Sequence, residues 1–304
     1  MKHLLKLLDL TKEEILEILN LGDQLKYEQK HGIPHHRLEG KTLGMIFAKS
    51  STRTRVSFEV GIYQLGGQGL FLSSNDMQIG RGEPVEDTAR VLSRYLDGIM
   101  IRTFAQKEVE DLAKYSSIPI INGLTDFAHP CQVLADLMTI REFKGHLQGL
   151  KLCYIGDGNN MANSLIVGAL KTDMKVSVAC PKGYEPSTEV LEFAEQMKQN
   201  GAEFELLTNP LEAAKNADVV ITDVWASMGQ EHEATERKKI FDGYQINSEL
   251  LKVAKPDAIV QHCLPAHRGE EISAEVLEAH AEEIFEEAEN RLHAQKAVMV
   301  KLMA

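Results

Sequence analysis

The feature that most constrains the fold is a repeated alternation of short apolar runs with segments of helical periodicity. Nine runs have the length and composition of buried strands. They are Thr42–Ala48, Gly69–Ser73, Gly98–Arg102, Ile118–Ile121, Leu150–Ile155, Lys175–Ala179, Glu203–Leu207, Asp218–Thr222 and Ala258–Gln261. The intervening segments have helical spacing, beginning with a helix to about Gln29 after a capping box of Thr11 and Glu14. This alternation is typical of parallel βαβ units, so we predict an α/β fold.

The nine runs form two groups, which Gln132–Phe143 separates as a single predicted linking helix. With 304 residues, the chain has the length of about two domains. We therefore expect two doubly wound parallel-sheet domains joined by that helix, spanning residues 1–137 and 138–289. Apolar spacing from Arg291 onward predicts a C-terminal helix, about 290–304, that packs back on the first domain.

Charge and cysteine usage exclude several classes of partner. The formal net charge of -12 disfavours nucleic acid and anionic membranes as partners. The four cysteines lie in unlike contexts, without CxxC pairs or metal-ligand spacing, so we expect neither a disulfide framework nor a metal site. The first apolar stretch is interrupted by Lys6 and Asp9 and lacks a cleavage site, which predicts a cytoplasmic protein.

Hydroxyls and arginines crowd the start of the helix that follows the first strand. Ser51, Thr52, Arg53 and Thr54 stand there, and helix amides, hydroxyls and a guanidinium fork together select a compact dianion such as phosphate. Arg102 ends another strand, where it could meet the same anion. Ordinary N-capping with solvated arginines is the alternative. A nucleotide P-loop fits poorly, because the glycine-rich pattern is absent.

His129 and Gln132 stand just before and at the start of the predicted linking helix. An imidazole and a carboxamide three residues apart could polarise a carbonyl oxygen and hold an amide NH₂. The alternative is a purely structural histidine in a loop.

Three strand ends in the second group carry polar residues. The segment 156–160 resembles a dinucleotide fingerprint, but Met161 replaces the next expected glycine and no acidic residue ends the following strand. Nicotinamide binding is therefore disfavoured, and Asn160 is left to bind a small zwitterion. Asp223 and Cys263 end two later strands, where a carboxylate and a thiol could orient and deprotonate an ammonium. A surface turn and a buried, inert cysteine are the alternatives.

Taken together, five motifs resemble those of the ornithine carbamoyltransferase family. They are STRTR at 51–55, HPCQ at 129–132, GDGNN at 156–160, DVWASMG at 223–229 and HCLP at 262–265. The resemblance spans almost the whole chain; the first two motifs occur in carbamoyltransferases generally, whereas the last two are typical of the ornithine branch. It implies an enzyme of arginine metabolism that transfers the carbamoyl group of carbamoyl phosphate to ornithine, giving citrulline and phosphate, without metal or organic cofactor.

The resemblance also implies roles for individual residues. For carbamoyl phosphate it implies Ser51, Thr52, Arg53, Thr54, Gln78, Arg102, His129, Gln132, Cys263, Leu264 and Arg291, the last at the head of the final helix. For ornithine it implies Asn160, Asp223, Ser227 and Met228. Among these, Arg102, His129, Asp223 and Cys263 would be catalytic. The family implies a homotrimer with shared sites, in which Gln78 reaches a neighbour's carbamoyl phosphate.

Three alternatives stay open at this point. Another amine, such as putrescine, agmatine or an acylated ornithine, could replace ornithine as acceptor. A regulatory subunit could bind carbamoyl phosphate without turnover, and a dehydrogenase is a remote third possibility. If a neutral δ-amine is the nucleophile, activity should rise from neutral to alkaline pH.

Overall fold

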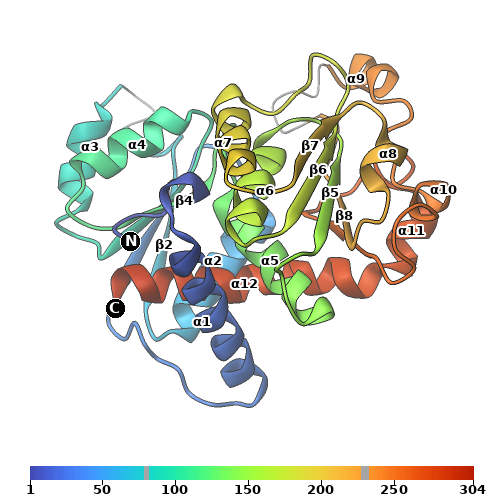
Figure 1. The fold of residues 1–304 in the computed structure, drawn as a ribbon. Helices are drawn as coiled ribbons and strands as arrows, with labels where there is room; N and C mark the ends of the chain where they lie inside the picture. The colour runs from blue at the N-terminus through green and yellow to red at the C-terminus, as the bar shows by residue number, and fades with distance from the viewer. Residues whose placement is uncertain (79–81, 227–232) are drawn as a thin grey trace. The chain divides into compact units, whose positions relative to one another are not determined.

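The computed structural model describes residues 1–78, 82–226 and 233–304 (Figure 1). The chain divides into two compact units, one formed by Met1–Ala135 with Asn290–Ala304 and the other by Asp136–Glu289. Each unit holds one parallel sheet with helices between its strands, which confirms the predicted α/β class with two parallel-sheet domains.

The first unit contains a four-stranded sheet of order β2-β1-β3-β4, in which all neighbours are parallel. Its strands are β1 (Thr42–Phe47), β2 (Gln68–Ser73), β3 (Gly98–Arg102) and β4 (Ile120–Leu124). Its own helices are η1 (Leu7–Asp9), α1 (Lys12–Lys30), α2 (Thr52–Gln64), α3 (Val85–Leu92) and α4 (Gln106–Tyr115). The chain moves outward from β1 to β2 and then returns past β1 to β3. The strand order therefore reverses between β1 and β3, where such sheets bind ligands.

The second unit contains a five-stranded parallel sheet of order β7-β6-β5-β8-β9. Its strands are β5 (Lys151–Ile155), β6 (Lys175–Ala179), β7 (Phe204–Leu207), β8 (Val219–Thr222) and β9 (Ile259–His262). Its helices are α6 (Asn160–Lys171), α7 (Thr188–Gln199), α8 (Pro210–Ala214), α9 (Ala234–Ile240), α10 (Ser248–Leu251) and α11 (Ala274–Ala279). Helices α6 and α7 lie on one side of the strands and α8 and α10 on the other (Figure 1). Here the order reverses between β5 and β8.

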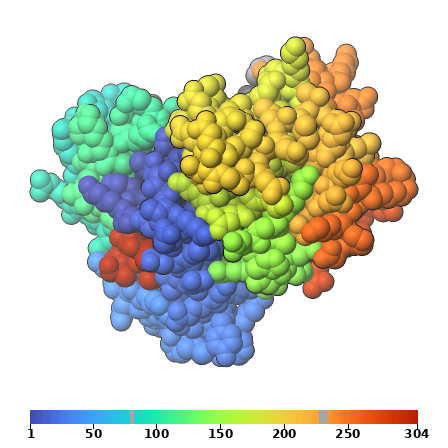
Figure 2. Space-filling model, viewed as in Figure 1, coloured from blue at the N-terminus to red at the C-terminus, as the bar shows by residue number. Residues whose placement is uncertain are grey.

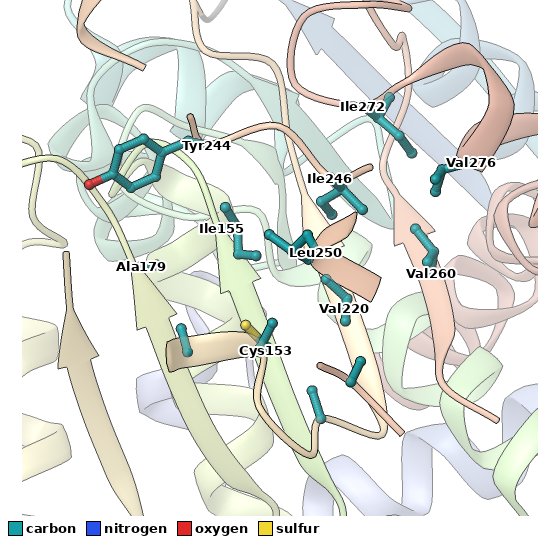
Figure 3. Close-up of a cluster of buried hydrophobic side chains, with 14 of the residues drawn as sticks. Cys153, Ile155, Ala179, Val220, Tyr244, Ile246, Leu250, Val260, Ile272 and Val276 are labelled. Atoms are coloured by element: carbon teal, nitrogen blue, oxygen red, sulfur yellow. The ribbon is translucent and has the colours of Figure 1, made fainter. Parts of the chain in front are cut away.

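The core of the second unit fixes the positions of its strand ends. Cys153 and Ile155 of β5, Val220 of β8 and Val260 of β9 are all fully buried. They pack with side chains from the helices and loops that cover this face, including Leu250 (Figure 3). Each such aliphatic side chain contributes about 1.5–3 kcal/mol when fully buried. Loops that leave the carboxyl edge of this sheet therefore start from firmly held points.

Two helices contribute to both units, and they begin earlier than the sequence predicted. Helix α5 (Pro130–Lys144) starts at Pro130, so Gln132 lies in its first turn, where a proline is tolerated because its missing N–H has no helical acceptor. Helix α12 (Ala281–Met303) starts at Ala281. The prediction that Arg291 stands at the head of the last helix is therefore wrong, since Arg291 lies well inside α12.

The C-terminal part of α12 packs back on the first unit, as predicted. Gly61 of α2 permits the close approach, because a Cβ there would lie 3.0 Å from Met299 Cε. Lys296 Nζ donates to Gln64 Oε1 at 3.0 Å and ties the same two helices. In the space-filling view the C-terminal residues, in red, lie among blue residues of the first unit (Figure 2).

One further prediction needs correction, and one acidic segment is more buried than its composition indicates. Strand β4 runs to Leu124 rather than ending at Ile121, because the polar Asn122 is fully buried and donates to Leu5 O at 2.8 Å. The acidic run Glu282–Glu289 is helical but only partly solvated: Glu287 is 1% exposed, and its Oε2 accepts the His262 N–H at 2.8 Å. Both residues found polar partners that the residue type alone does not indicate.

In the described part of the chain, no helix is both long enough and apolar enough to span a membrane.

Candidate functional site

In the first unit, a helix start lies at the carboxyl end of β1, beside the point where the strand order reverses. Ser51 is the N-cap of α2, and its hydroxyl accepts the Thr54 N–H at 3.2 Å. Thr52 and Arg53 are exposed in the first turn, whose amides have no acceptor within the helix. Ser51 thus performs the capping considered as an alternative, and the helix start remains able to receive an anion.

Two buried guanidinium groups converge on one hydroxyl at this place. Arg102 Nη1 donates to Thr54 Oγ1 at 3.5 Å, and Arg291 Nη2 donates to the same oxygen at 3.3 Å. Thr54 is 1% exposed and each arginine 5%. Arg102 ends β3, whereas Arg291 comes from α12. Two cations held this close repel each other, so the arrangement favours an anionic ligand.

His129 and Gln132 join the same cluster. Burial, with Arg291 and Arg102 nearby, holds the pKa of His129 well below its usual value. The imidazole is therefore neutral at pH 7 and can donate one N–H to a carbonyl oxygen without acting as a cation. Gln132 Oε1 accepts from Arg291 Nη1. A carbonyl oxygen has two lone pairs, so this acceptor retains capacity for an amide ligand. We call Thr54, Arg102, His129, Gln132 and Arg291 the first half-site.

The turn before His129 has its own support, which sequence reasoning missed. Thr125 Oγ1 accepts the Ala128 N–H at 3.0 Å and donates to Gln106 Oε1 at 2.7 Å. Thr125 and Ala128 also pair through their backbones at 2.9 Å. A threonine three residues before a helix-leading segment is a turn signal that could have been noticed.

In the second unit, Asp223 follows β8 and is the centre of a hydrogen-bonded group. Its Oδ1 accepts from Cys263 Sγ at 3.0 Å and from the Val224 N–H at 2.8 Å. Its Oδ2 accepts from Asn159 Nδ2 at 2.9 Å. The two residues predicted to act together, Asp223 and Cys263, are thus in contact. We call Asn159, Asp223 and Cys263 the second half-site.

Cys263 is a thiol rather than a thiolate in this structure. Burial and the neighbouring Asp223 carboxylate raise its pKa well above the usual value. The thiol donates to Asp223, so the predicted deprotonation of an ammonium cannot use Cys263 as the base in this state. Leu264 follows with φ of +55°, a left-handed conformation rare for leucine, and its N–H donates to His262 Nδ1 at 2.9 Å.

Asn159 is the member of the second half-site that sequence reasoning missed. It is the N-cap of α6, and its Oδ1 accepts the N–H groups of Met161 and Ala162 at 2.9 and 3.3 Å. The preference of asparagine for the N-cap position was the available signal. Asn160, predicted to bind a zwitterion, is the first residue of α6 and is half-buried, and its role stays a prediction.

The remaining predicted residues lie apart from these contacts or outside the described residues. Ser227 and Met228 fall outside them. Gln78 is exposed, and its carbonyl accepts the Glu83 N–H at 3.1 Å within its own segment.

One group in the described part of the chain has metal-ligand spacing. It consists of His267, Glu270 and Glu271, whose ligand atoms lie within 4.8 Å of one another. Glu271 Oε1 already accepts from His262 Nε2 at 3.0 Å and from the His267 N–H at 2.6 Å. The group belongs to neither half-site, and we assign it no metal.

Comparison with known proteins covers both units. Residues 2–142 match the family model of the aspartate/ornithine carbamoyltransferase carbamoyl-P binding domain, and residues 148–302 match that of the Asp/Orn binding domain. An ornithine carbamoyltransferase of Thermococcus kodakarensis is 59% identical over 99% of this chain and 96% of its own length. That of Oceanobacillus iheyensis is 60% identical over 100% of this chain and 94% of its own length.

A solved structure agrees with these relatives. The ornithine carbamoyltransferase from Pyrococcus furiosus superposes with a TM-score of 0.95 at 56% identity, covering 99% of this chain and 97% of that one. Both matched models together cover nearly all of the sequence, and the similarity extends through the strand ends that carry the two half-sites. The chain belongs to the aspartate/ornithine carbamoyltransferase family.

Proposed function

We propose that the protein transfers the carbamoyl group of carbamoyl phosphate to the δ-amine of L-ornithine, giving L-citrulline and phosphate. The observation that carries this proposal is the convergence of buried Arg102 and Arg291 on Thr54, beside a neutral His129. Such a cluster suits a ligand that has both an anionic phosphate and a polarisable carbonyl. The names of the relatives at 59–60% identity support the same reaction.

Carbamoyl phosphate is assigned to the first half-site and the adjoining helix start. Ser51, Thr52, Arg53 and Thr54 receive the phosphate at the positive end of α2. Arg102 and His129 donate to the carbonyl oxygen, and Gln132 accepts from the carbamoyl NH₂. Cys263 and Leu264, whose backbone carbonyls the resemblance assigns to the same nitrogen, belong to the second unit. Their role, like that of Gln78, stays a prediction.

Ornithine is assigned to the second half-site. Asp223 presents a carboxylate to a substrate with two amines, whereas aspartate as an acceptor would meet repulsion there. Asn160 stands at the start of α6 for the substrate's α-carboxylate. The roles of Ser227 and Met228 are proposed from the family resemblance alone.

Chemistry then follows from these positions. The neutral δ-amine attacks the carbonyl carbon and forms the N–C bond, while charge develops on the carbonyl oxygen. Arg102 and His129 stabilise that oxyanion with fixed donors. Collapse breaks the C–O bond to phosphate, which leaves towards the cationic cluster, and the nitrogen loses its extra proton to phosphate or solvent. Because ornithine must be deprotonated before attack, activity rises from neutral to alkaline pH.

A competition assay tests the proposal. Carbamoyl phosphate is supplied with ornithine, putrescine, N-acetylornithine and aspartate, and each product is quantified. Citrulline well above the other products is the expected result. Product from another amine would leave the assignment of carbamoyl phosphate to the first half-site intact and refute ornithine as the acceptor. Binding of carbamoyl phosphate without any product would indicate a regulatory subunit.

Assembly and location complete the proposal. We infer an oligomer, because large apolar side chains are exposed along α2 and the edge strand β2, and the family resemblance implies that it is a homotrimer. These side chains are Val56, Val60, Tyr63, Leu70 and Phe71. Light scattering coupled to size exclusion would refute this by giving a monomer mass. A cytoplasmic location agrees with four free cysteines, and fractionation of cells tests it.

A further inference from the structure

Arg237, in α9, is a nearly buried arginine that bonds to two loops of the second unit and to Glu233, the N-cap of its own helix. Its Nη1 donates to Asp157 Oδ2 and to Trp225 O, each at 2.8 Å. Its Nε donates to Glu233 Oε2 at 3.0 Å. Arg237 is 7% exposed and Asp157 8%. One guanidinium therefore links the loop after β5 to the loop after β8, the two strands between which the strand order reverses.

We propose that Arg237 is a positioning residue for the amino-acid acceptor, holding these two loops in the register that lets Asn159 contact Asp223. The proposal rests on the proposed function, because it concerns the acceptor half of that reaction. Arg237 donates to Asp157, to the Trp225 carbonyl and to Glu233. It acts through residues two positions away on each side, as Asp157 precedes Asn159 and Trp225 follows Asp223.

The loop after β5 is stiff enough to transmit this constraint. Asp157 O accepts from Tyr154 OH at 2.9 Å and from the Asn159 N–H at 2.7 Å. Gly158 packs so tightly that a Cβ would lie 2.3 Å from the Glu185 carbonyl carbon. Fixing the Asp157 carboxylate therefore fixes Asn159, whose Nδ2 meets Asp223 Oδ2 at 2.9 Å.

Charge gives Arg237 a second consequence. Burial raises the pKa of Asp157, and the Arg237 guanidinium opposes that rise. Without the arginine, a second buried acidic group would stand near Asp223 with no cation beside it, and breaking such a pair costs much stability. A test must therefore separate loss of register from loss of charge balance.

The decisive variants are Arg237→Gln, Arg237→Lys, and the double variant Arg237→Gln with Asp157→Asn. Lys252→Gln, in an exposed ion pair with Glu249, is the matched control. Steady-state kinetics give KM for each substrate, and calorimetry with carbamoyl phosphate present gives the affinity for L-norvaline, which is ornithine without its δ-amine. Thermal melting reports stability.

We expect Arg237→Gln to raise the ornithine KM and the norvaline Kd by about tenfold to a hundredfold, since small misplacements carry such penalties. The carbamoyl phosphate KM should change by less than about twofold, because the substitution does not displace residues of the first half-site. Arg237→Lys should give an ornithine KM between those of the wild type and Arg237→Gln, because lysine keeps the positive charge but lacks the planar set of guanidinium donors. The double variant should recover thermal stability, because no buried carboxylate is left unpaired, and should keep the high ornithine KM.

Full recovery of ornithine affinity in the double variant would overturn the positioning role, as would unchanged ornithine kinetics in folded Arg237→Gln. Equal rises in both substrate KM values would also overturn it and indicate general damage. If Arg237→Gln does not fold, the double variant alone decides, by its ornithine KM and norvaline affinity. Absence of citrulline from the unaltered protein would instead refute the proposed function.

Discussion

The two half-sites are built by opposite means. The first gathers residues that are distant in the chain, from α2, β3, α5 and α12, and relies on concentrated positive charge. The second gathers residues from three strand-end loops, and both oxygens of Asp223 accept hydrogen bonds from neighbouring groups. Recognition in the first therefore depends on charge, and recognition in the second depends on the direction of individual hydrogen bonds. Changes of charge should damage one half-site, and isosteric changes should damage the other.

The largest expected effect tests the charged half-site. Arg102→Met removes one donor to the carbonyl oxygen, and loss of such a donor lowers kcat by about 10²–10³-fold. Arg102→Lys should retain only part of the wild-type kcat, because lysine lacks the planar set of guanidinium donors. Stopped assays of citrulline formation measure both, with Arg90→Met on the exposed face of α3 as control. A loss of less than about threefold would remove Arg102 from the reaction.

Arg53 tests whether the exposed helix start shares that role. Arg53→Ala removes a charge-assisted phosphate contact worth on the order of 1.5–3 kcal/mol, which should appear mainly in the carbamoyl phosphate KM. Solvent reaches Arg53, so the lower end of that range is expected. Kinetics at two salt concentrations provide the measurement. Unchanged kinetics would place the phosphate elsewhere.

Two variants of Asn159 test the second half-site. Asn159→Ser and Asn159→Asp both keep an N-cap oxygen for α6, and both lose the Nδ2–H that meets Asp223 Oδ2. We expect the ornithine KM to rise by about tenfold in the first, since a hydrogen bond to a charged group is lost. The aspartate variant should be worse and should shift the pH profile upward, because two carboxylates then share a proton.

The pH dependence of stability provides a smaller effect that involves the first half-site alone. The pKa of His129 is lowered in the folded protein, so the unfolded chain binds a proton that the folded chain does not. Stability from this group is therefore complete above about pH 6.5 and is lost as pH falls through that value, by at most about 1.4 kcal/mol per pH unit. Urea unfolding from about pH 8 to about pH 5 should show a shallower loss in His129→Gln than in the wild type. Parallel curves would contradict a neutral His129.

The smallest expected effect is a labelling rate. Three cysteines are fully buried, and burial raises the pKa of Cys131 and Cys153 to about 12. Cys263 is partly exposed but protonated, so it should be alkylated first and slowly, and faster with rising pH. Mass spectrometry identifies the site, and carbamoyl phosphate with L-norvaline should protect it. Earlier labelling of Cys131 would contradict the burial of the first half-site.

Much of the fold could be predicted from the periodicity of apolar residues. The errors in the predicted strand bounds have physical causes. The strands at Gly98–Arg102 and Lys175–Ala179 were predicted with their observed bounds, because each is a short apolar run between clear breaks. Strand β4 was cut short at Asn122, since apolar runs cannot indicate a buried asparagine whose partner is the backbone of Leu5. A hydrogen bond across more than a hundred residues leaves no periodic signal.

The sequence predicted which residue types stand at the strand ends of the site. It did not predict most of the hydrogen bonds between them. The contact of Asp223 with Cys263 follows from two neighbouring strands, β8 and β9, so it could be predicted. Arg237 could not, because its partners include the Trp225 carbonyl and the Asp157 carboxylate, and Asp157 lies 80 residues earlier in the chain. Asn159 lay in between: its capping role was readable, whereas its bond to Asp223 was not.

The return of the chain to its first unit has a consequence for synthesis. Thr54, Arg102, His129 and Gln132 precede the whole second unit, and Arg291 follows it. A growing chain must therefore complete the second unit before Arg291 adds the second guanidinium group to the first half-site. Until the last residues have been made, the nascent protein lacks one of the two guanidinium groups of the first half-site, so this cluster is completed only at the end of translation.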